Sequence, residues 1–232
     1  MPEPMTAPQP SYDELTLDEL AIALAPAIAD SAVFDGWTDE ALAMAAEVEG
    51  VDTDVARLAY PASGLQGRAM AMITAWVRSI DAQMAAALPP EVLGAMKIRE
   101  RIRALVEFRL DAVEGQEEAL RRALAIMAMP QNAPAALKIG WNSADVMWRL
   151  AGDTATDYNH YTKRAILASI YGATLAVFVG DESEDKADTR AFLDRRIEGV
   201  MRFEKAKARL TGGERERFSV TRFLGRLRYP AS

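Results

Sequence analysis

Apolar residues recur along this chain at intervals of three and four positions, the spacing that gives an α-helix one apolar face. Between residues 66 and 88, for example, Met70, Ile73 and Val77 follow this spacing, and Pro89-Pro90 ends the segment. We find no alternating pattern of a length that would predict a strand. The pattern therefore predicts an all-α protein, with helices over residues 17–34, 39–49, 53–58, 66–88, 91–113, 116–129, 133–150, 157–178 and 189–210.

The lengths of these helices divide the chain into four parts. Residues 1–12 contain four prolines and no periodicity, so we expect a disordered tail. Residues 13–62 hold short helices with tight turns, which predicts a trihelical head in which Pro26 makes a kink or a boundary. Residues 63–211 hold longer helices, expected to form a ligand-binding and dimerisation domain, and residues 212–232 form a basic amphipathic segment.

The segment from Ala165 to Val179 is apolar on every side of its predicted helix. Such a helix is buried all round, or packs on one side and lines a ligand cavity or dimer interface on the other. It is shorter than the roughly 18–20 residues needed to cross a bilayer. The N-terminus lacks the basic and apolar regions of a secretory signal, so we expect a soluble protein.

Few residue types suited to catalysis are present. The chain has no cysteine and one histidine, His160, which excludes disulfides and thiol catalysis and limits metal or triad chemistry to one imidazole. Asp157-x-x-His160 is half of a di-iron carboxylate motif, and the second histidine is missing. The acidic loop Asp181–Asp185 lacks the glycine of a calcium-binding loop. We expect no catalytic residue, cofactor or metal.

Charge is distributed unevenly. Up to Tyr60 the chain has 13 acidic residues and one basic residue, Arg57, a net charge of −12 within a total of −7. A trihelical head before long helices resembles the TetR family of repressors, and residues 30–51 fit that family's opening, with an Ala-rich second helix before Glu-Gly-Val. The recognition helix would then present Asp52, Asp54 and Arg57. Because DNA binding depends on neutralising phosphates, we expect no nucleic-acid partner.

Residues 141–203 carry a more specific resemblance. The blocks Ala-Gly-Asp (151–153), Thr-Asp-Tyr-Asn (156–159), Tyr-Thr-Lys-Arg (161–164) and Phe-Leu-Asp-Arg-Arg-Ile (192–197) resemble the lipid-binding accessory protein of ubiquinone biosynthesis (coenzyme Q protein nine). The resemblance implies a TetR-like fold without DNA binding, a homodimer, and an apolar cavity for an isoprenoid quinone or phospholipid. It also implies a partnership with the di-iron demethoxyubiquinone hydroxylase.

Two sets of site residues follow from this resemblance. The partner-binding patch falls on Met147, Leu150, Asp157, His160, Tyr161 and Arg164. Four of these are at helical spacing on one face, which favours a patch, although the alternative is a contact with a neighbouring helix. Many relatives have Trp where this chain has His160, which puts the same mode of binding in doubt. The lipid-binding cavity is expected to be lined by Trp141, Trp148, Ile166, Ile170, Tyr171, Leu175 and Phe178.

The C-terminal segment predicts contact with an anionic membrane surface. From Arg202 onward the chain has nine basic and three acidic residues. Apolar and basic side chains occupy opposite faces of a predicted helix, as in helices that lie in a membrane interface. The membrane-binding residues would be Val220, Arg222, Phe223, Leu224, Arg226 and Leu227. The alternative is a terminal helix folded back on the body.

The sequence therefore predicts a non-catalytic lipid-binding protein that presents an isoprenoid quinone intermediate or phospholipid to the hydroxylase. We expect a cytoplasmic protein, peripheral on the inner face of the inner membrane in bacteria, or on the matrix face in mitochondria. Two alternatives are a TetR-type regulator with an apolar effector and an enzyme that acts on an isoprenoid quinone by itself.

Overall fold

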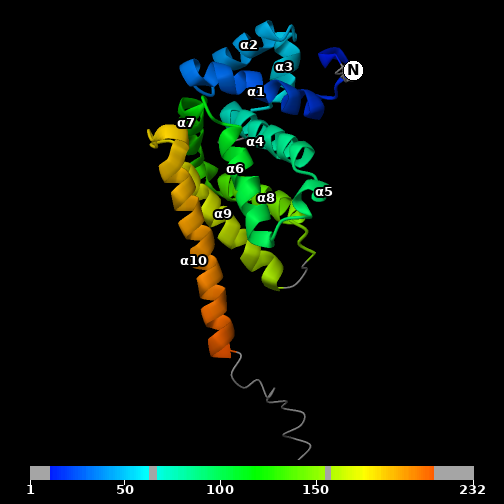
Figure 1. Cartoon of the computed structure of the whole chain (residues 1–232). Coiled ribbons are helices and arrows are strands. Elements are labelled where there is room, and N and C mark those ends of the chain that lie inside the picture. Colours follow the sequence, from blue (N-terminus) through cyan, green and yellow to red (C-terminus); the bar gives the residue numbers. More distant parts are fainter. Residues whose placement is uncertain (1–10, 63–66, 155–157, 212–232) are drawn as a thin grey trace, which may run out of the picture. The chain divides into compact units, whose positions relative to one another are not determined.

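The computed structural model of the chain describes residues 11–62, 67–154 and 158–211, and every regular element in these ranges is helical (Figure 1). This confirms the predicted all-α class. The α-helices are α1 (Leu17–Asp35), α2 (Asp39–Val48), α3 (Thr53–Ala59), α4 (Gly67–Ala87), α5 (Pro90–Leu93), α6 (Ile98–Asp111), α7 (Glu117–Met127), α8 (Ala133–Leu150), α9 (Tyr158–Phe178) and α10 (Ala187–Thr211). Short 3-10 helices are η1 (Tyr12–Glu14), η3 (Pro130–Asn132) and η4 (Glu184–Lys186).

Residues up to Leu193 form one compact unit, and residues from Asp194 onward form a second. The first unit contains α1 to α9 and the beginning of α10. In the second, the described part of α10 carries an ion pair between Arg202 and Glu198 at 3.5 Å. None of the helices within the described ranges has both the length and the apolar character of a membrane-spanning helix.

The first three helices form the expected trihelical head. Thr16 caps α1 in a reciprocal capping box with Glu19, Thr38 caps α2, and Asp52 caps α3. These side chains accept hydrogen bonds from backbone N–H groups that the first helical turn leaves without partners. Pro26 lies inside α1 and does not end it, so of the two predicted alternatives, a kink or a boundary, the boundary is wrong.

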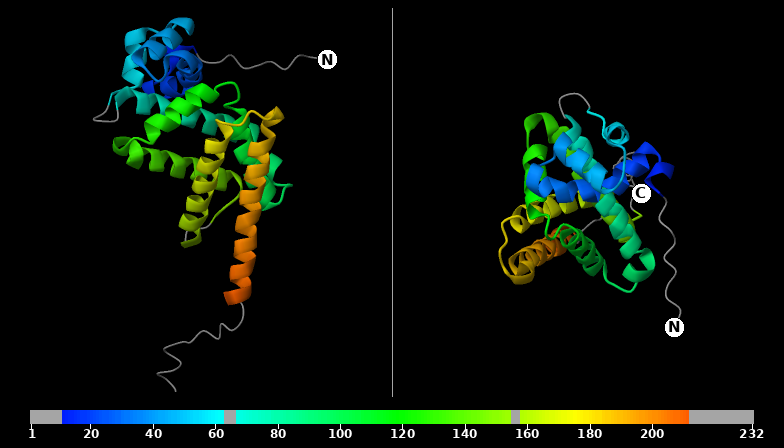
Figure 2. Two further views of the ribbon diagram at one scale, coloured as in Figure 1. Left: turned by 90° about the vertical axis from the view of Figure 1, so that its left-hand side faces the viewer. Right: turned by 90° about the horizontal axis from the view of Figure 1, so that it is seen from above.

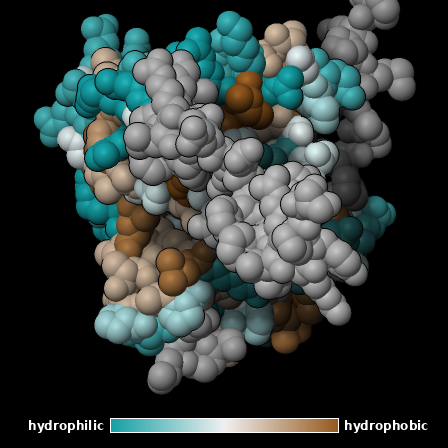
Figure 3. Space-filling view, turned by 90° about the horizontal axis from the view of Figure 1, so that it is seen from below, coloured by the Kyte–Doolittle hydropathy of each residue, from teal (hydrophilic) through white to brown (hydrophobic). Residues whose placement is uncertain are grey.

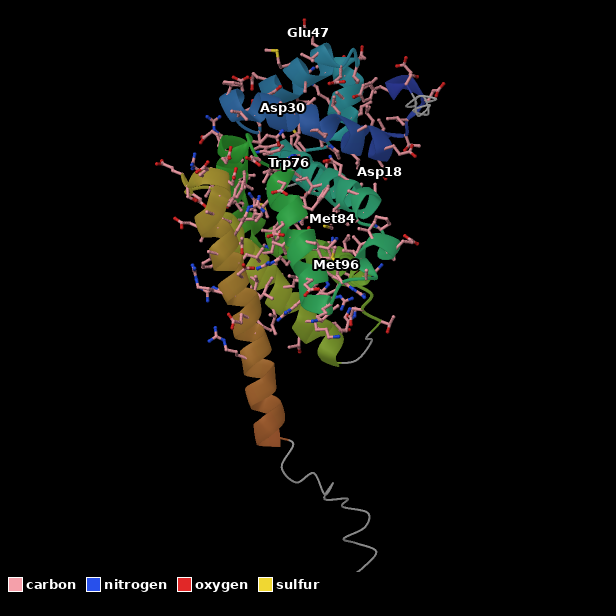
Figure 4. All side chains as sticks on the ribbon, in the orientation of Figure 1. Asp18, Asp30, Glu47, Trp76, Met84 and Met96 are labelled. Atoms are coloured by element: carbon pink, nitrogen blue, oxygen red, sulfur yellow. The ribbon has the colours of Figure 1, made fainter. Side chains whose placement is uncertain are left out.

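The head packs on the upper end of the bundle (Figures 1 and 2). Trp37 is buried at this junction, where its Nε1–H donates to the carbonyl oxygen of Ala119 in α7 at 2.9 Å. Its ring centroid lies 5.2 Å from that of Trp76 in α4, a residue labelled below the head in Figure 4. α1 contacts both α4 and α7 along its length. The head is therefore held by buried contacts to two helices of the bundle.

The predicted helix over residues 91–113 is instead two helices, α5 and α6. Lys97 adopts an extended conformation, and its backbone N–H donates to the Glu100 side chain at 3.0 Å, which starts a new helix. Arg101 stabilises the break, because its guanidinium donates to the carbonyl oxygens of Gly94, Met96 and Ala151. Arg101 therefore donates hydrogen bonds to carbonyl oxygens that the ends of both α5 and α8 leave without a partner within the helix.

α8 and α9 follow one another in the chain and pack against each other. α8 ends as predicted at Leu150, and Gly152 follows with φ of +89°. The N–H of Asp153 donates to the carbonyl of Trp148 at 2.9 Å and that of Gly152 to Arg149 at 2.9 Å, the pattern of a Schellman motif. Glycine is required because a side chain disfavours this left-handed conformation. The predicted cap of α9 at Thr156 or Asp157 lies outside the described residues.

Candidate functional site

An apolar cavity of about 500 Å³ lies within the first unit, between α4, α6, α7, α8 and α9. α4 contributes Ile73, Trp76 and Ile80, and α7 and α8 contribute further apolar side chains. The α9 wall consists of small residues interrupted by larger ones, in the order Ala165, Ala168, Ser169, Tyr171, Gly172 and Leu175. The apolar segment of α9 therefore forms one wall of this cavity, and a ligand in it or a dimer interface on it stays a prediction.

The cavity communicates with the surface. Leu137 of α8 belongs to its wall and is 76% exposed, and Gly172 of α9 is also exposed. In the view from below, apolar side chains gather at the lower left of the picture (Figure 3). An added Cβ at Gly140 or Gly172 would meet no atom within 4 Å, so the backbone of both helices borders open space. A ligand can therefore reach the apolar interior without unfolding of the chain.

Arg109 places a charge in this otherwise apolar wall. Its side chain is 1% exposed and pairs with Asp81 of α4, and its Nη2 donates to the hydroxyl of Ser143 in α8 at 3.2 Å. The guanidinium carbon lies 4.8 Å from the ring centroid of Tyr171 in α9. Burial alone would lower the pKa of Arg109, but Tyr171 and Asp81 raise it, so the guanidinium stays protonated. Burial raises the pKa of Asp81 against the opposing effect of Arg109.

An aromatic cluster adjoins the cavity. Trp141 of α8 lines the cavity, and its ring centroid lies 6.0 Å from that of Tyr161 and 6.5 Å from that of His160 in α9. The rings of His160 and Tyr161 meet edge to face at 5.1 Å. Tyr161 is 61% exposed. Trp141 therefore connects the cavity wall to an exposed aromatic surface.

A charge cluster holds the first turns of α9 to α8. Arg164 is 2% exposed and donates through Nε to Asp145 at 2.5 Å and through Nη1 to Asp153 at 3.0 Å. Lys163 also pairs with Asp153, at 2.6 Å, and the exposed Arg149 pairs with Asp145 at 2.8 Å. The two carboxylates thus receive four ion pairs. The blocks Ala-Gly-Asp and Tyr-Thr-Lys-Arg of the sequence supply three of the side chains and the glycine turn.

The predicted partner patch is only partly a surface. Tyr161 is exposed, and His160 and Leu150 are half-buried. Met147 and Arg164 are buried, which corrects their placement on a binding surface: Met147 lies on the inner face of α8, and Arg164 is enclosed by its two aspartates. For Arg164 the alternative of a contact with a neighbouring helix is therefore correct. Asp157 lies outside the described residues.

Of the seven residues predicted to line a lipid-binding cavity, Trp141, Tyr171 and Leu175 line this cavity, and lipid binding by it stays a prediction. The other four lie elsewhere. Ile166 and Ile170 occupy the opposite face of α9. Trp148 turns toward the first part of α9, where its Nε1–H donates to the carbonyl of Lys163 at 3.0 Å, and Phe178 is buried with Lys186 5.1 Å above its ring. A helix that is apolar all round gives no signal of which face borders the cavity.

The sequence analysis did not predict that Arg109 lines the cavity. In α6 the buried residues are Ile102, Leu105, Val106, Arg109 and Leu110, so Arg109 occupies a position on the apolar stripe. A lone cation at such a position signals either an internal ion pair or a binding site. That signal was present in the sequence. The partners Asp81 and Ser143 come from other helices, and no local pattern connects them to Arg109.

The remaining predictions concern parts that the structure leaves out. The membrane-binding residues, from Val220 to Leu227, lie outside the described residues. The homodimer and the hydroxylase contact involve other molecules and stay predictions. In the head, Arg57 is the basic residue of α3, the helix that would face DNA in a TetR-type repressor, and it pairs with Asp54 of the same helix at 3.0 Å.

Comparison with known proteins gives one consistent result. A family model described as COQ9 matches residues 133–204, which cover α8, α9 and most of α10. The mitochondrial ubiquinone biosynthesis protein COQ9 of Rattus norvegicus is 36% identical over 173 residues, which are 72% of this chain and 54% of the rat protein. The corresponding protein of Homo sapiens is 35% identical over 173 residues, 72% of this chain and 52% of the human protein. The chain spans about half the length of these relatives.

Proposed function

Because this chain belongs to the COQ9 family of ubiquinone biosynthesis proteins, we propose that it is a non-catalytic lipid-binding protein. In this proposal it binds an isoprenoid quinone intermediate or a phospholipid and presents it to the di-iron demethoxyubiquinone hydroxylase. It works at a membrane, on the inner face of the inner membrane, as a homodimer. The observation that carries the proposal is the open apolar cavity between α4, α6, α7, α8 and α9.

The cavity suits part of a prenyl or acyl chain. Its volume of about 500 Å³ lies in the range of small-molecule sites. Each methylene group that leaves water for such a wall contributes roughly 0.8 kcal/mol. A long isoprenoid chain exceeds this volume, so part of it would stay outside, beyond the exposed Leu137.

The lining also supports a role in binding rather than catalysis. Among the described lining residues, the charged group is Arg109, and it is neutralised by Asp81. No carboxylate or imidazole of the described chain belongs to the wall, so a general acid or base would have to come from elsewhere. Presentation to a second protein that performs the chemistry fits this composition.

We propose that the hydroxylase binds at the aromatic surface and receives the lipid there. Trp141 borders the cavity and contacts His160 and Tyr161, so a partner bound to Tyr161 would lie close to the ligand. Exposed tyrosine is enriched in protein interfaces because it buries a large area with little loss of side-chain entropy. Of the predicted patch, we retain Leu150, His160 and Tyr161 as the side chains that a hydroxylase can reach.

Filling the cavity tests the proposal. Gly140→Leu and Gly172→Leu each place a side chain in open space in a helix, without a backbone clash. We expect binding of a decyl-substituted dimethoxymethylbenzoquinone, measured by quenching of the fluorescence of Trp76 and Trp141, to weaken about tenfold or more, the equivalent of two or more lost methylene contacts. Thermal unfolding should stay within a few degrees of wild type.

Gly199→Leu is the matched control, because Gly199 also lies in a helix, with open space around it, and is not part of the cavity. It should bind the quinone as the wild type does. Unchanged binding by both cavity variants, or absence of binding by the wild type, would contradict the proposal.

Membrane contact is a separate part of the proposal. It rests on the basic and apolar composition of residues 212–232. Deletion of the chain after Gly213 should reduce flotation of the protein with anionic vesicles and leave thermal unfolding unchanged. Equal flotation of the full and shortened chains would show that attachment does not depend on this segment.

A further inference from the structure

The trihelical head exposes four large apolar side chains on two adjoining helices. Met44 and Val48 of α2 are four residues apart, Val55 and Leu58 of α3 are three apart, and each pair therefore shares one face of its helix. Val48 is 73% exposed and Leu58 is 65% exposed. Single exposed apolar residues are ordinary, whereas several together are typical of an interaction surface. We call these four side chains the head patch.

The two helices that carry the head patch lie on the side of the head that faces away from the bundle. α1 makes the main contacts of the head with α4 and α7, and α2 and α3 pack on α1 and on each other. Figure 1 shows α2 and α3 above α1, and Figure 4 shows Glu47 of α2 at the outer end of the head. A partner can therefore reach the head patch without displacing a helix of the bundle.

Carboxylates surround the head patch. Residues 39–59 contain one basic residue, Arg57, and six acidic residues, which are Asp39, Glu40, Glu47, Glu49, Asp52 and Asp54. Asp54 pairs with Arg57 at 3.0 Å, and Asp39 pairs with Arg68 of α4 at 2.7 Å. Glu40 and Glu47 are exposed, and neither forms an ion pair with another residue that the structure describes. The surface around the head patch therefore stays negatively charged.

This charge decides among the possible occupants of the head patch. A nucleic-acid backbone and an anionic lipid surface are themselves negative, so both are repelled. The same face of a second copy is also negative, so a head-to-head contact would bring like charges together. A cationic protein surface is attracted instead. Because the head patch lies on two packed helices and the described head has no strand to extend, a helix is the element that fits it.

We propose that the head patch binds a basic amphipathic helix of a partner protein. The apolar face of this helix, with residues at i, i+3 or i+4 and i+7, covers Val48, Val55 and Leu58. Its lysine or arginine side chains pair with Glu40 and Glu47. The inference goes beyond the proposed function and does not depend on it, because no residue of α1, α2 or α3 lines the cavity.

Three fluorescein-labelled peptides of about 18 residues test which chemistry the head patch selects. The first has leucine at every third or fourth position and arginine and alanine elsewhere. The second has glutamate in place of arginine, and the third has serine in place of leucine. Fluorescence anisotropy with the full chain should show that the first peptide binds about tenfold or more tightly than either of the others. Its affinity should fall as salt increases from about 50 mM to about 500 mM.

Val48→Ser combined with Leu58→Ser tests the apolar part of the head patch. Both side chains are exposed, so thermal unfolding should stay within a few degrees of wild type. We expect the affinity for the first peptide to fall about tenfold or more, because two apolar contacts are lost. Val92→Ser combined with Ile98→Ser is the matched control, since these side chains are also exposed and apolar but lie in α5 and α6. It should bind the peptide as the wild type does.

Glu40→Gln combined with Glu47→Gln tests the charged part. We expect the affinity for the first peptide to fall about threefold or more at about 50 mM salt and to approach that of wild type at about 500 mM, where exposed charges are screened. Glu91→Gln combined with Glu182→Gln is the matched control, because both glutamates are exposed and lie outside the head. This control should bind as the wild type does at both salt concentrations.

Four outcomes would overturn the proposal. Absence of binding by the first peptide, or equal binding of all three peptides, would show that the partner class is wrong. Equal binding of the first peptide by the wild type and by Val48→Ser with Leu58→Ser would show that another surface binds it. Loss of a wild-type oligomer by this variant in sedimentation velocity would assign the head patch to a second copy.

Reduced flotation of the same variant with vesicles of phosphatidylglycerol and phosphatidylcholine would assign the head patch to a membrane and would likewise overturn the proposal. We expect both the sedimentation and the flotation of the variant to equal those of the wild type. Quinone binding should also be unchanged in every head variant, because the head does not line the cavity. Failure of the head proposal therefore leaves the proposed function untouched.

Discussion

Among the residues that the structure describes, two arginines are almost completely buried, and their surroundings differ. Arg164, at the start of α9, is 2% exposed and donates to Asp145, Asp153 and the carbonyl oxygen of His160. Arg109, in the cavity wall, is 1% exposed and retains a buried Nε without a partner. Burial and an aspartate partner are common to both. The difference lies in whether the protein itself satisfies the guanidinium.

This difference concerns how completely each charge cluster is satisfied. The Arg164 cluster joins α8, α9 and the turn between them, and its charged groups pair with one another. The Arg109 cluster joins three helices, and the Nε of Arg109 is enclosed by the protein without a hydrogen-bond partner. Buried donors without a partner are uncommon in folded proteins, so the Arg109 cluster is the less completely satisfied of the two.

Removal of Arg164 should have the largest effect on stability. Arg164→Met leaves Asp145 and Asp153 largely buried without their main cation, and the loss of one partner of a buried pair costs about 3–5 kcal/mol. Urea titration of the variant should show this decrease in the free energy of unfolding. Quinone affinity of the folded fraction should stay within about twofold, because Arg164 does not line the cavity.

Arg149→Ala is the matched control for Arg164→Met. Arg149 pairs with the same Asp145 at 2.8 Å, but its side chain is mostly exposed. An exposed pair contributes about 0–1 kcal/mol, so the two variants should differ severalfold in their effect on stability. Equal effects would show that burial does not explain the role of Arg164. A large change in quinone affinity would show that the cluster also shapes the cavity.

Asp181 is a carboxylate whose two oxygens both accept hydrogen bonds within the protein. We expect its replacement to change the free energy of unfolding less than that of Arg164. Burial would raise the pKa of Asp181, but hydrogen bonds from the side chains and backbone N–H groups of Ser183 and Thr189 lower it well below its usual range. A lowered folded pKa contributes stability above the unfolded pKa of about 3.9, and this stability is lost as pH falls through the folded pKa.

Asp181→Asn should therefore lower the free energy of unfolding at pH 7 and reduce its loss on acidification. Urea titrations of both proteins between pH 7 and pH 3 measure the two curves. The difference in the free energy of unfolding between wild type and variant should become smaller as pH falls below about 4. A constant difference across this range would mean that the hydrogen bonds, and not the charge, are what Asp181 contributes.

Much of the fold could be predicted because its determinants are local. The spacing of apolar residues predicted α4, α7, α8 and α10 to within a few residues, and the Thr38 cap and the Gly152 turn that bound two of the helices are short-range features. Capping side chains and a positive φ act within four or five residues, so a sequence records them directly. The division of 91–113 into α5 and α6 was missed; one of the contacts that stabilise it, from Arg101 to the carbonyl of Ala151, joins residues 50 positions apart.

The sequence by itself determined the all-helical class, the acidic head and the apolar character of α9. Only the tertiary structure decided which face of α9 borders the cavity, that Arg164 and Met147 are interior, and that Asp81, Ser143 and Arg109 meet. The physical reason is that periodicity specifies which side of a helix avoids water, whereas the neighbour it meets depends on the packing of other helices. The apolar cavity is formed by those contacts between helices.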